Sequence, residues 1–330
     1  MKIAVIGGGS WGTALAQMLA VKGHEIALLV RQRHVAEAIA ATHMNSAYLP
    51  GVRLSSGILP TVNKDEALLG AGCVLFSVPC QFFRATLREV RPLLPHGAVV
   101  VCSNKGLEVE TGKTVSQMVE EELAGLAPRF AMLSGPSFAA DVVRGRPTAI
   151  VMGCADPDLG RELRELFSTT SFRAYSCTDV RGVELGGAVK NVIAIAAGMS
   201  DGMGFGDNAR AALITRGLAE MSRLGVAMGA RASTFMGLSG MGDLVLTCTG
   251  DLSRNRQVGL RLGQGIPLER ILGEMHQVAE GVKTTQAVYA LGHRLGVELP
   301  ITNAMHAVMY DGKNRQDAWQ ELMTRELKEE

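Results

Sequence analysis

The sequence predicts an α/β protein, in which a Rossmann-type doubly wound, mainly parallel sheet domain is followed by an all-helical domain. Three observations support this fold class. The first half alternates short apolar runs with stretches of helical periodicity, which is the pattern of right-handed βαβ units. A glycine-rich turn directly follows the first apolar run, and after about Asp179 strand-like runs disappear while helical periodicity continues. We therefore expect a sheet domain over residues 1–178 and a helical domain over residues 179–330.

Each expected element follows from a local pattern of apolar residues. Short apolar runs bounded by turn residues predict strands at Lys2–Ile6, Glu25–Val30, Cys73–Val78, Ala98–Cys102, Phe130–Leu133, Thr148–Met152 and Phe172–Ser176. Helical periodicity between these strands predicts helices at Trp11–Val21, Gln81–Leu94 and Thr114–Leu123. In the second half it predicts helices at Val183–Met199, Arg210–Leu224, Ala232–Met236, Leu268–Met275, Thr284–Leu295 and Asp317–Leu327.

Composition narrows the possible classes of protein. The chain has 330 residues, 47% of them hydrophobic, which is enough for two cores. Lys+Arg 33 against Asp+Glu 32 gives a net charge of +1, which argues against a general nucleic-acid binder. The six cysteines lack the spacing of a zinc site, so we expect small buried hydrophobes and no metal. The N-terminus enters a strand pattern at once and no run approaches the ~18 apolar residues of a membrane span, so we expect a cytoplasmic protein without integral membrane contact.

The opening glycines predict that the first domain binds a dinucleotide. Gly7, Gly9 and Gly12 fit G-x-G-x-x-G between the first strand and the first helix. In that motif the glycines allow a tight turn, approach of the backbone to a pyrophosphate, and close packing of helix on strand. The pyrophosphate binds to the amides at the start of the helix. The alternative is a glycine-rich turn that serves packing only.

The end of the second strand indicates which dinucleotide is accepted. NAD-preferring proteins commonly carry Asp or Glu there, about 20 residues beyond the glycines. This chain has Val30-Arg31-Gln32-Arg33-His34 instead. An arginine fork suits a 2′-phosphate, so we expect NADP(H) to be accepted alongside or in preference to NAD(H). Alternatively, Arg31 and Arg33 are exposed surface charges.

Two other strand ends offer groups that bind anions. Lys105 follows the strand Ala98–Cys102, and Ser134-Gly135-Pro136-Ser137-Phe138-Ala139 follows Phe130–Leu133. Ligands of such sheets bind beyond the carboxyl ends of the strands. A cation, a hydroxyl group and backbone amides are therefore expected in one crevice.

A single lysine interrupts a nearly apolar helix in the second half. The residues that share the helix face of Lys190 are all small: Gly186, Gly187, Ala194 and Ala197. Such a face leaves room for a ligand beside the ammonium. Close helix–helix packing is the alternative, since small residues permit that too.

A set of polar residues further along suits a phosphate. Arg254 and Asn255, with the hydroxyl of Ser253, form a compact group of donors. Ser253 also reads as the N-cap of a helix, and the two roles are compatible because a helix start is itself an anion site. Asp243 could pair with a lysine, and Arg256 is expected to be an ordinary solvated charge.

Several motifs occur together and in order, and they cover essentially the whole chain. They are G-G-G-S-W-G-T-A-L-A, S-N-K-G-L-E, L-S-G-P-S-F-A, G-A-V-K-N-V-I-A-I-A-A-G and G-M-G-D-L, followed by S-R-N. In this combination the chain resembles the bacterial-type NAD(P)-dependent glycerol-3-phosphate dehydrogenases. The resemblance implies a Rossmann-type domain joined to a helical, substrate-binding domain with the site between them. It also implies interconversion of dihydroxyacetone phosphate and sn-glycerol 3-phosphate, which feeds glycerophospholipid synthesis.

The resemblance further implies roles for individual residues. The cofactor would be contacted by Ser10, Trp11, Arg31, His34, Lys105, Ala139, Arg254, Val278 and Glu280, beside the glycines of the loop. The substrate would be lined by Lys105, Gly135, Ser137, Lys190, Asp243, Ser253, Arg254 and Asn255. Lys190 matches the catalytic lysine of the family.

The expected chemistry is hydride transfer to a ketone with protonation of its oxygen. A protonated lysine stabilises the growing negative charge and can deliver the proton. We assign that role to Lys190, with Lys105 polarising or anchoring the same end of the substrate. A second ammonium nearby would lower the pKa of a lysine, whereas the carboxylate of Asp243 would oppose this effect. The sequence does not show which effect is larger.

Two alternative functions are also compatible with a two-domain dinucleotide-binding protein. A 2-ketoacid or 3-hydroxyacid dehydrogenase would take substrates that end in a carboxylate, and a silent NADP-binding sensor would bind cofactor without turnover. A homodimer is a possible assembly, given the apolar helical half.

Overall fold

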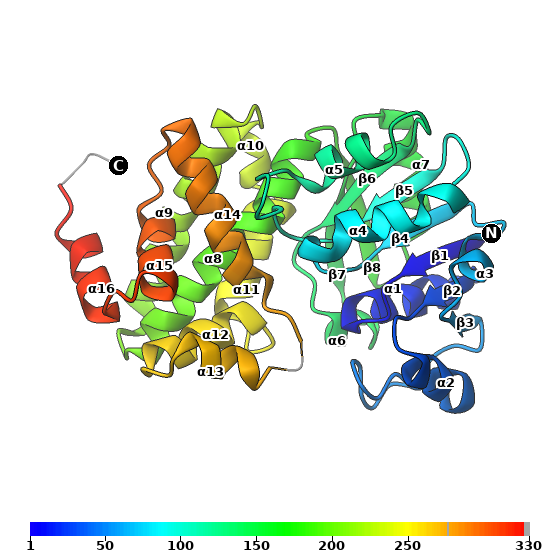
Figure 1. Cartoon of the computed structure of the whole chain (residues 1–330), viewed down its shortest axis with the longest axis horizontal. Coiled ribbons are helices and arrows are strands. Elements are labelled where there is room, and N and C mark those ends of the chain that lie inside the picture. Colours follow the sequence, from blue (N-terminus) through cyan, green and yellow to red (C-terminus); the bar gives the residue numbers. More distant parts are fainter. Residues whose placement is uncertain (276, 327–330) are drawn as a thin grey trace. The chain divides into compact units, whose positions relative to one another are not determined.

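The computed structural model describes residues 1–275 and 277–326. It divides into two compact units (Figure 1). The first unit contains Met1–Lys105 and Thr114–Glu184, and the second contains Gly106–Lys113 and Leu185–Glu330. The expected division after residue 178 differs from this partition in two respects. Residues 179–184 belong to the first unit, and the segment 106–113 belongs to the second.

The first unit is built on an eight-stranded sheet with the order β3-β2-β1-β4-β5-β6-β7-β8. Its strands are β1 (Lys2–Ile6), β2 (Glu25–Leu29), β3 (Ile58–Thr61), β4 (Cys73–Phe76), β5 (Val99–Cys102), β6 (Arg129–Ser134), β7 (Thr148–Gly153) and β8 (Phe172–Cys177). All neighbours are parallel except β6 and β7. Because β1 lies between β2 and β4, the chain reverses direction across the sheet there, and such a switch point is where these folds bind ligands.

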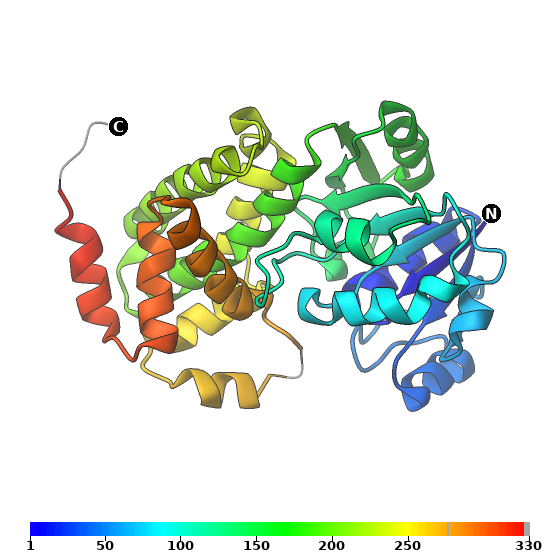
Figure 2. The same ribbon diagram turned by 45° about the horizontal axis from the view of Figure 1, so that its top comes forward.

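Helices cover both faces of this sheet (Figures 1 and 2). The first unit contains α1 (Ser10–Val21), α2 (Arg33–Thr42), α3 (Lys64–Leu68), α4 (Cys80–Val90), the short 3₁₀ helix η1 (Arg91–Leu93), α5 (Val115–Glu122), α6 (Ala139–Val142) and α7 (Pro157–Phe167). Alternate residues of β1 enter different cores. Ile3 and Val5 pack with α1, α2 and α7, whereas Ala4 and Ile6 pack with α4 and α5. This alternation is what makes the sheet doubly wound, since both faces must be apolar.

The expected fold class is confirmed, and each expected strand is present with its ends within two residues of the expected ones. One strand, β3, was not expected. Its sequence I-L-P-T contains Pro60, which lacks an N–H and usually argues against a strand. β3 lies at the edge of the sheet, where a missing donor is tolerated, and Leu59 is exposed there.

The second unit is helical. It contains most of α8 (Val180–Gly202), then α9 (Gly206–Ala227), α10 (Ala232–Phe235), the π-helical turn η2 (Leu238–Gly242), α11 (Asp243–Thr249), α12 (Arg254–Gly263), α13 (Leu268–Gly273), α14 (Glu280–Leu295), α15 (Pro300–Tyr310) and α16 (Arg315–Met323). The last helix was expected to reach Leu327, which lies outside the described residues. Within the described chain, α8 alone is long and apolar enough to cross a membrane, and its apolar window is wholly buried, as in the core helix of a folded protein.

Four glycines bring α8 and α12 into backbone contact. A Cβ on Gly198 would overlap the carbonyl oxygen of Arg256, and one on Gly202 would overlap that of Leu260. From the other side, a Cβ on Gly259 or Gly263 would overlap carbonyl oxygens of α8. The two helices therefore touch along the last turns of α8, and side chains that begin at this contact must lie along the partner helix.

Two buried glutamates accept hydrogen bonds from the starts of distant helices. Glu220 of α9 accepts the backbone N–H groups of Ile301 (2.5 Å) and Thr302 (3.2 Å), at the start of α15. Glu184 accepts the N–H (2.6 Å) and hydroxyl (2.7 Å) of Ser116, at the start of α5. These bonds favour the carboxylate, but burial outweighs them and raises the pKa of each side chain to about 7.

We expect these two acids to make the free energy of unfolding depend on pH. Because their pKa is about 7 in the folded chain and about 4.5 when unfolded, the folded state binds more protons between these values. The contribution of each of these two groups to the free energy of unfolding should therefore fall as pH rises from 4.5 to 7, by at most about 1.4 kcal/mol per pH unit, and level off above. Urea denaturation at several pH values measures this slope. Glu220→Gln should remove the contribution of Glu220 to this pH dependence, and Glu184→Gln should remove that of Glu184. A slope that is unchanged in both variants would contradict the assignment.

Candidate functional site

Of the three motif glycines in the loop after β1, packing requires Gly7 and Gly12 but not Gly9. Gly7 has a φ of +116°, and a Cβ there would overlap the carbonyl oxygen of Ser77, which follows β4. A Cβ on Gly12 would overlap the carbonyl oxygen of Gly7. Gly9 is different, since its φ of −72° and ψ of −179° suit any residue and a Cβ would meet nothing within 4 Å. Packing alone therefore does not explain Gly9, whereas the approach of a pyrophosphate does.

The start of α1, directly after this loop, carries two polar side chains. The indole Nε1 of Trp11 is buried and has no hydrogen-bond partner among the residues the structure describes. Such an orphaned donor is uncommon in folded proteins and points to a bound group. The neighbouring Ser10 donates its hydroxyl to the carbonyl oxygen of Tyr48 (2.6 Å), which fixes its side chain beside the loop. The loop and these residues fit a dinucleotide.

The basic residues after β2 are exposed. Arg31 lies in a bend directly before α2, and Arg33 and His34 form the first turn of that helix. All three side chains are accessible to solvent. Their exposure agrees with a surface role and leaves them equally accessible to a 2′-phosphate.

The loops after β4, β5 and β6 are tied together at the carboxyl edge of the sheet. The ammonium of Lys105 donates to the carbonyl oxygen of Gly135 (3.3 Å), and the hydroxyl of Ser137 donates to the same oxygen (3.0 Å). Gly135 has a φ of +131° and its Cα faces β7 at a distance that leaves little room for a side chain. The structure thus brings together the three residues that the sequence placed in one crevice. Ala139 begins α6 directly after this loop and is partly exposed.

Asn104 is a candidate that the sequence reasoning did not single out. Its side-chain N–H group donates to the carbonyl oxygen of Val78 (2.9 Å), which links the loops after β4 and β5. Its Oδ1 is buried and, within residues 1–275 and 277–326, has no hydrogen-bond partner; the same holds for the hydroxyl of Ser134. An asparagine in a strand-end loop reads as a turn residue, so only the fold reveals these unsatisfied atoms next to Lys105.

Lys190 is buried in the second unit and held by α11. Its side chain is 7% exposed, and its ammonium forms an ion pair with Asp243, whose side chain is 2% exposed. The same ammonium donates to the hydroxyl of Thr247 (2.8 Å), one turn after Asp243 on α11. A buried charge requires a partner, and α11 supplies one from a fixed direction.

Part of the small-residue face beside Lys190 has a packing reason. A Cβ on Gly186 would meet the carbonyl carbon and oxygen of Ser239, in the π-helical turn η2 before α11. Close packing of α8 against η2 thus accounts for this glycine. It also sets the distance at which α11 presents Asp243 to Lys190.

The start of α12 carries the predicted phosphate ligands. Ser253 is the N-cap and accepts the backbone N–H of Arg256 (3.2 Å), so the capping role is observed. Arg254 is exposed and donates one N–H to the carbonyl oxygen of Val278 (2.8 Å). Val278 is exposed, and Glu280 is the first residue of α14.

Asn255 connects three helices. Its side chain donates to Oδ1 of Asn191 on α8 (2.9 Å) and accepts the backbone N–H of Gly281 on α14 (2.9 Å). Asn191 directly follows Lys190 in the sequence. The amide of Asn255 therefore ties the start of α12 to the helix that carries Lys190.

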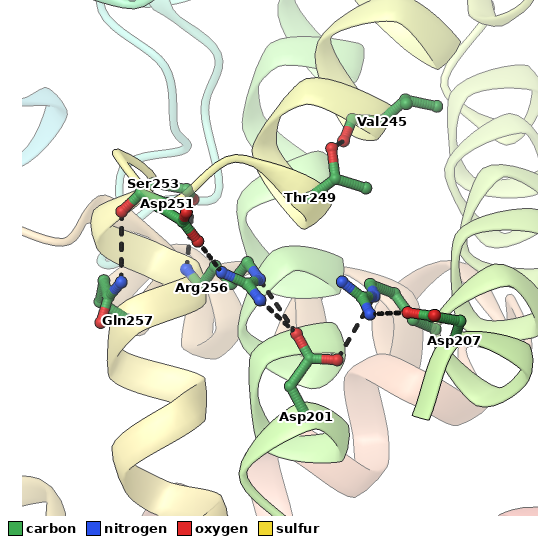
Figure 3. A network of polar contacts seen from close by, with 9 residues as sticks. Asp201, Asp207, Val245, Thr249, Asp251, Ser253, Arg256 and Gln257 are labelled. Carbon is green, nitrogen blue, oxygen red and sulfur yellow. Dashed lines mark hydrogen bonds and ion pairs between the residues drawn. The ribbon is translucent and has the colours of Figure 1, made fainter. Parts of the chain in front are cut away.

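The expectation that Arg256 is an ordinary solvated charge is wrong. Its side chain is 12% exposed, and its guanidinium donates to Asp201 (3.0 and 2.8 Å) and to Asp251 (2.8 Å) (Figure 3). The physical reason is the backbone contact between α8 and α12. Because Arg256 begins at that contact, its side chain lies along α8 and meets Asp201 in the last turn.

Comparisons with known proteins agree along the whole chain. Residues 2–160 match the family model of the NAD-dependent glycerol-3-phosphate dehydrogenase N-terminus, and residues 179–320 match that of the C-terminus. The chain is 66% identical to glycerol-3-phosphate dehydrogenase [NAD(P)+] of Nitratidesulfovibrio vulgaris over 330 residues, covering 100% of both chains. It is 57% identical to the protein of the same name from Solidesulfovibrio magneticus, again over 100% of both. The crystal structure of glycerol-3-phosphate dehydrogenase from Coxiella burnetii superposes with a TM-score of 0.95 at 37% identity, covering 98% of this chain and 99% of that one.

Proposed function

Because this chain belongs to the NAD-dependent glycerol-3-phosphate dehydrogenases, we propose that Lys190 is the acid and base of its reaction and that the start of α12 holds the substrate phosphate. The enzyme interconverts dihydroxyacetone phosphate and sn-glycerol 3-phosphate with NAD(P)H as cofactor. The observation that carries the proposal is the buried ion pair of Lys190 with Asp243.

Lys190 suits the chemistry at the carbonyl oxygen of the ketone. When C2 accepts a hydride, negative charge develops on that oxygen, and an ammonium stabilises the charge and delivers the proton. In the reverse direction the neutral amine removes the proton of the alcohol. Asp243 and Thr247 hold the ammonium from one side, so its direction is set before the substrate binds, which reduces the reorganisation required in the transition state.

Most of the proposed cofactor contacts belong to the first unit. A bound NAD(P)H would supply the hydride, and NAD(P)+ would accept it in the reverse direction. The glycine loop and the amides at the start of α1 would hold the pyrophosphate, with Ser10 and Trp11 beside them. Arg31 and His34 would bind the ribose that carries the 2′-phosphate. Lys105, Ala139, Arg254, Val278 and Glu280 are the other proposed cofactor contacts.

The proposed substrate contacts form two groups. Lys105, Gly135 and Ser137 would bind near the reacting carbon, while Ser253, Arg254 and Asn255 would bind the phosphate. A phosphate at the start of α12 benefits from backbone N–H groups and from the helix dipole. Arg254 donates one of its N–H groups to Val278, which orients the guanidinium while other N–H groups can reach an anion. Binding energy from the phosphate orients the carbon that reacts.

Arg254→Ala tests the phosphate contact. Hydrogen bonds to charged groups contribute about 1.5–3 kcal/mol each, so we expect KM for dihydroxyacetone phosphate to rise about 10- to 100-fold. At saturating cofactor, where a weaker contact of Arg254 with the cofactor has no effect, the kcat/KM for dihydroxyacetone, which has no phosphate, should change much less. Steady-state assays with NADPH and with NADH measure both substrates. Arg270→Ala, an exposed arginine of α13, is the control, and equal losses on the two substrates with Arg254→Ala would argue against the contact.

A homodimer and a cytoplasmic location stay predictions from the sequence. The reason for proposing a dimer is the apolar character of the helical half, because two copies would bury apolar surface against each other. Sedimentation velocity distinguishes it from a monomer, since the chain mass is 35.0 kDa.

A further inference from the structure

Arg256 lies at the centre of an ion-pair network in the second unit (Figure 3). Two of its N–H groups donate to Oδ2 of Asp201, in the last turn of α8. Arg210 of α9 approaches the other oxygen of Asp201 at 3.4 Å. The carboxylate is 9% exposed, so Arg256 and Arg210 are its principal compensation.

The same guanidinium also holds the loop that leads into α12. Nη1 of Arg256 donates to Asp251 (2.8 Å), and the side chain of Gln257 donates to the carbonyl oxygen of Asp251 (3.2 Å) (Figure 3). Ser253 lies between these residues and accepts the backbone N–H of Arg256. Arg256 therefore contacts the chain on both sides of Ser253, through its backbone N–H at Ser253 itself and through the exposed carboxylate of Asp251 before it.

Other contacts also hold α12 against α8. Gly259 and Gly263 hold its later turns against the backbone of α8, and Asn255 bonds to Asn191 at its start. Arg256 acts on the first turn and on the loop before it. That is the part of α12 with the proposed phosphate ligands.

We propose that Arg256 is a positioning residue for the phosphate end of the substrate: paired with Asp201, it fixes the first turn of α12 so that Ser253 and its neighbours converge on the phosphate. This inference rests on the proposed function. Arg256 itself would not touch the substrate, since its N–H groups are directed to Asp201 and Asp251. Through Asp201, Arg256 links the first turn of α12 to α8, the helix that also carries Lys190.

The test is Arg256→Gln. KM for dihydroxyacetone phosphate should rise about tenfold, which corresponds to about 1.4 kcal/mol, while kcat stays within about twofold, as expected when uniform binding is lost. The kcat/KM for dihydroxyacetone should stay close to that of the parent enzyme. Arg261→Gln is the matched control, because Arg261 lies on the same helix, pairs with Glu274 and has a side chain that is 26% exposed. Arg261→Gln should leave the kinetic constants for both substrates unchanged.

A merely structural role would give a different pattern. If Arg256 only stabilised the fold, Arg256→Gln would lower the melting temperature and affect the two substrates equally. Asp201→Asn should reproduce the selective rise in KM, and the double variant should be no worse than Arg256→Gln, since the two side chains act as one pair. Should Arg256→Gln fail to fold, Asp201→Asn decides: a KM for dihydroxyacetone phosphate equal to that of the parent enzyme overturns the proposal.

The outcome also separates this inference from the proposed function. If Arg254→Ala impairs the phosphorylated substrate selectively but Arg256→Gln does not, the positioning role is wrong and the phosphate site stands. If Arg254→Ala has no selective effect, the phosphate site itself is misplaced.

Discussion

Lys190→Ala is expected to lower kcat about 1,000-fold, within the range of 10²–10⁴ that a positioned acid or base contributes. The reason is that the alkoxide formed at C2 loses both its electrostatic partner and its proton donor. Cofactor affinity should stay close to its original value, because none of the proposed cofactor contacts includes Lys190. Pre-steady-state turnover with dihydroxyacetone phosphate and direct binding of NADPH measure the two quantities separately.

The control for this variant concerns stability. Removing the ammonium leaves Asp243 buried without its ion-pair partner, and breaking a buried pair typically costs about 3–5 kcal/mol. The double variant Lys190→Met with Asp243→Asn removes both charges and should recover much of the melting temperature without recovering turnover. Near-normal kcat in Lys190→Ala would remove this lysine from the mechanism.

Sequence patterns predicted the strands of the sheet because buried parallel strands require continuous apolar runs. They missed β3, where Pro60 argues against a strand unless its edge position is known. They did not reveal that β7 runs antiparallel to β6, since a strand has the same apolar pattern in either direction. They also extended α16 too far along the chain, because the end of a helix depends on caps and contacts more than on periodicity.

For the site, the sequence identified residues that stand out locally, such as a lysine in an apolar helix and glycines after a strand. It could not identify partners that only the fold brings together. Asn191 lies 64 positions before the Asn255 to which it bonds, and Asp201 lies 55 positions before Arg256. Arg256 was misjudged for the same reason, since nothing local distinguishes an arginine in an ion pair from a solvated one. A weak signal existed at Asn191, a polar residue directly after Lys190 within an apolar helix.

The glycine loop permits a second test with a large effect. Gly9→Ala should weaken cofactor binding about 10- to 100-fold, the equivalent of one lost hydrogen bond to a charged group. The added methyl group would occupy the space that the pyrophosphate needs, whereas the protein itself places nothing within 4 Å of it. The melting temperature without cofactor should therefore stay unchanged. Isothermal titration with NADPH and thermal denaturation of the same samples give both values.

Gly12→Ala is the matched variant, with the opposite balance of effects. Its methyl group would overlap the carbonyl oxygen of Gly7 and approach the side chain of Ser77 at 3.1 Å. Helix α1 would have to move away from the sheet, at a cost of about 1–3 kcal/mol typical of overpacking, so the melting temperature should fall even without cofactor. If Gly9→Ala lowered the melting temperature as Gly12→Ala does and left NADPH affinity intact, the loop would serve packing alone. If Gly9→Ala lowers NADPH affinity without lowering the melting temperature, whereas Gly12→Ala lowers the melting temperature, then Gly9 is the glycine that the ligand requires. Nothing in the folded chain lies close enough to exclude a side chain at this position.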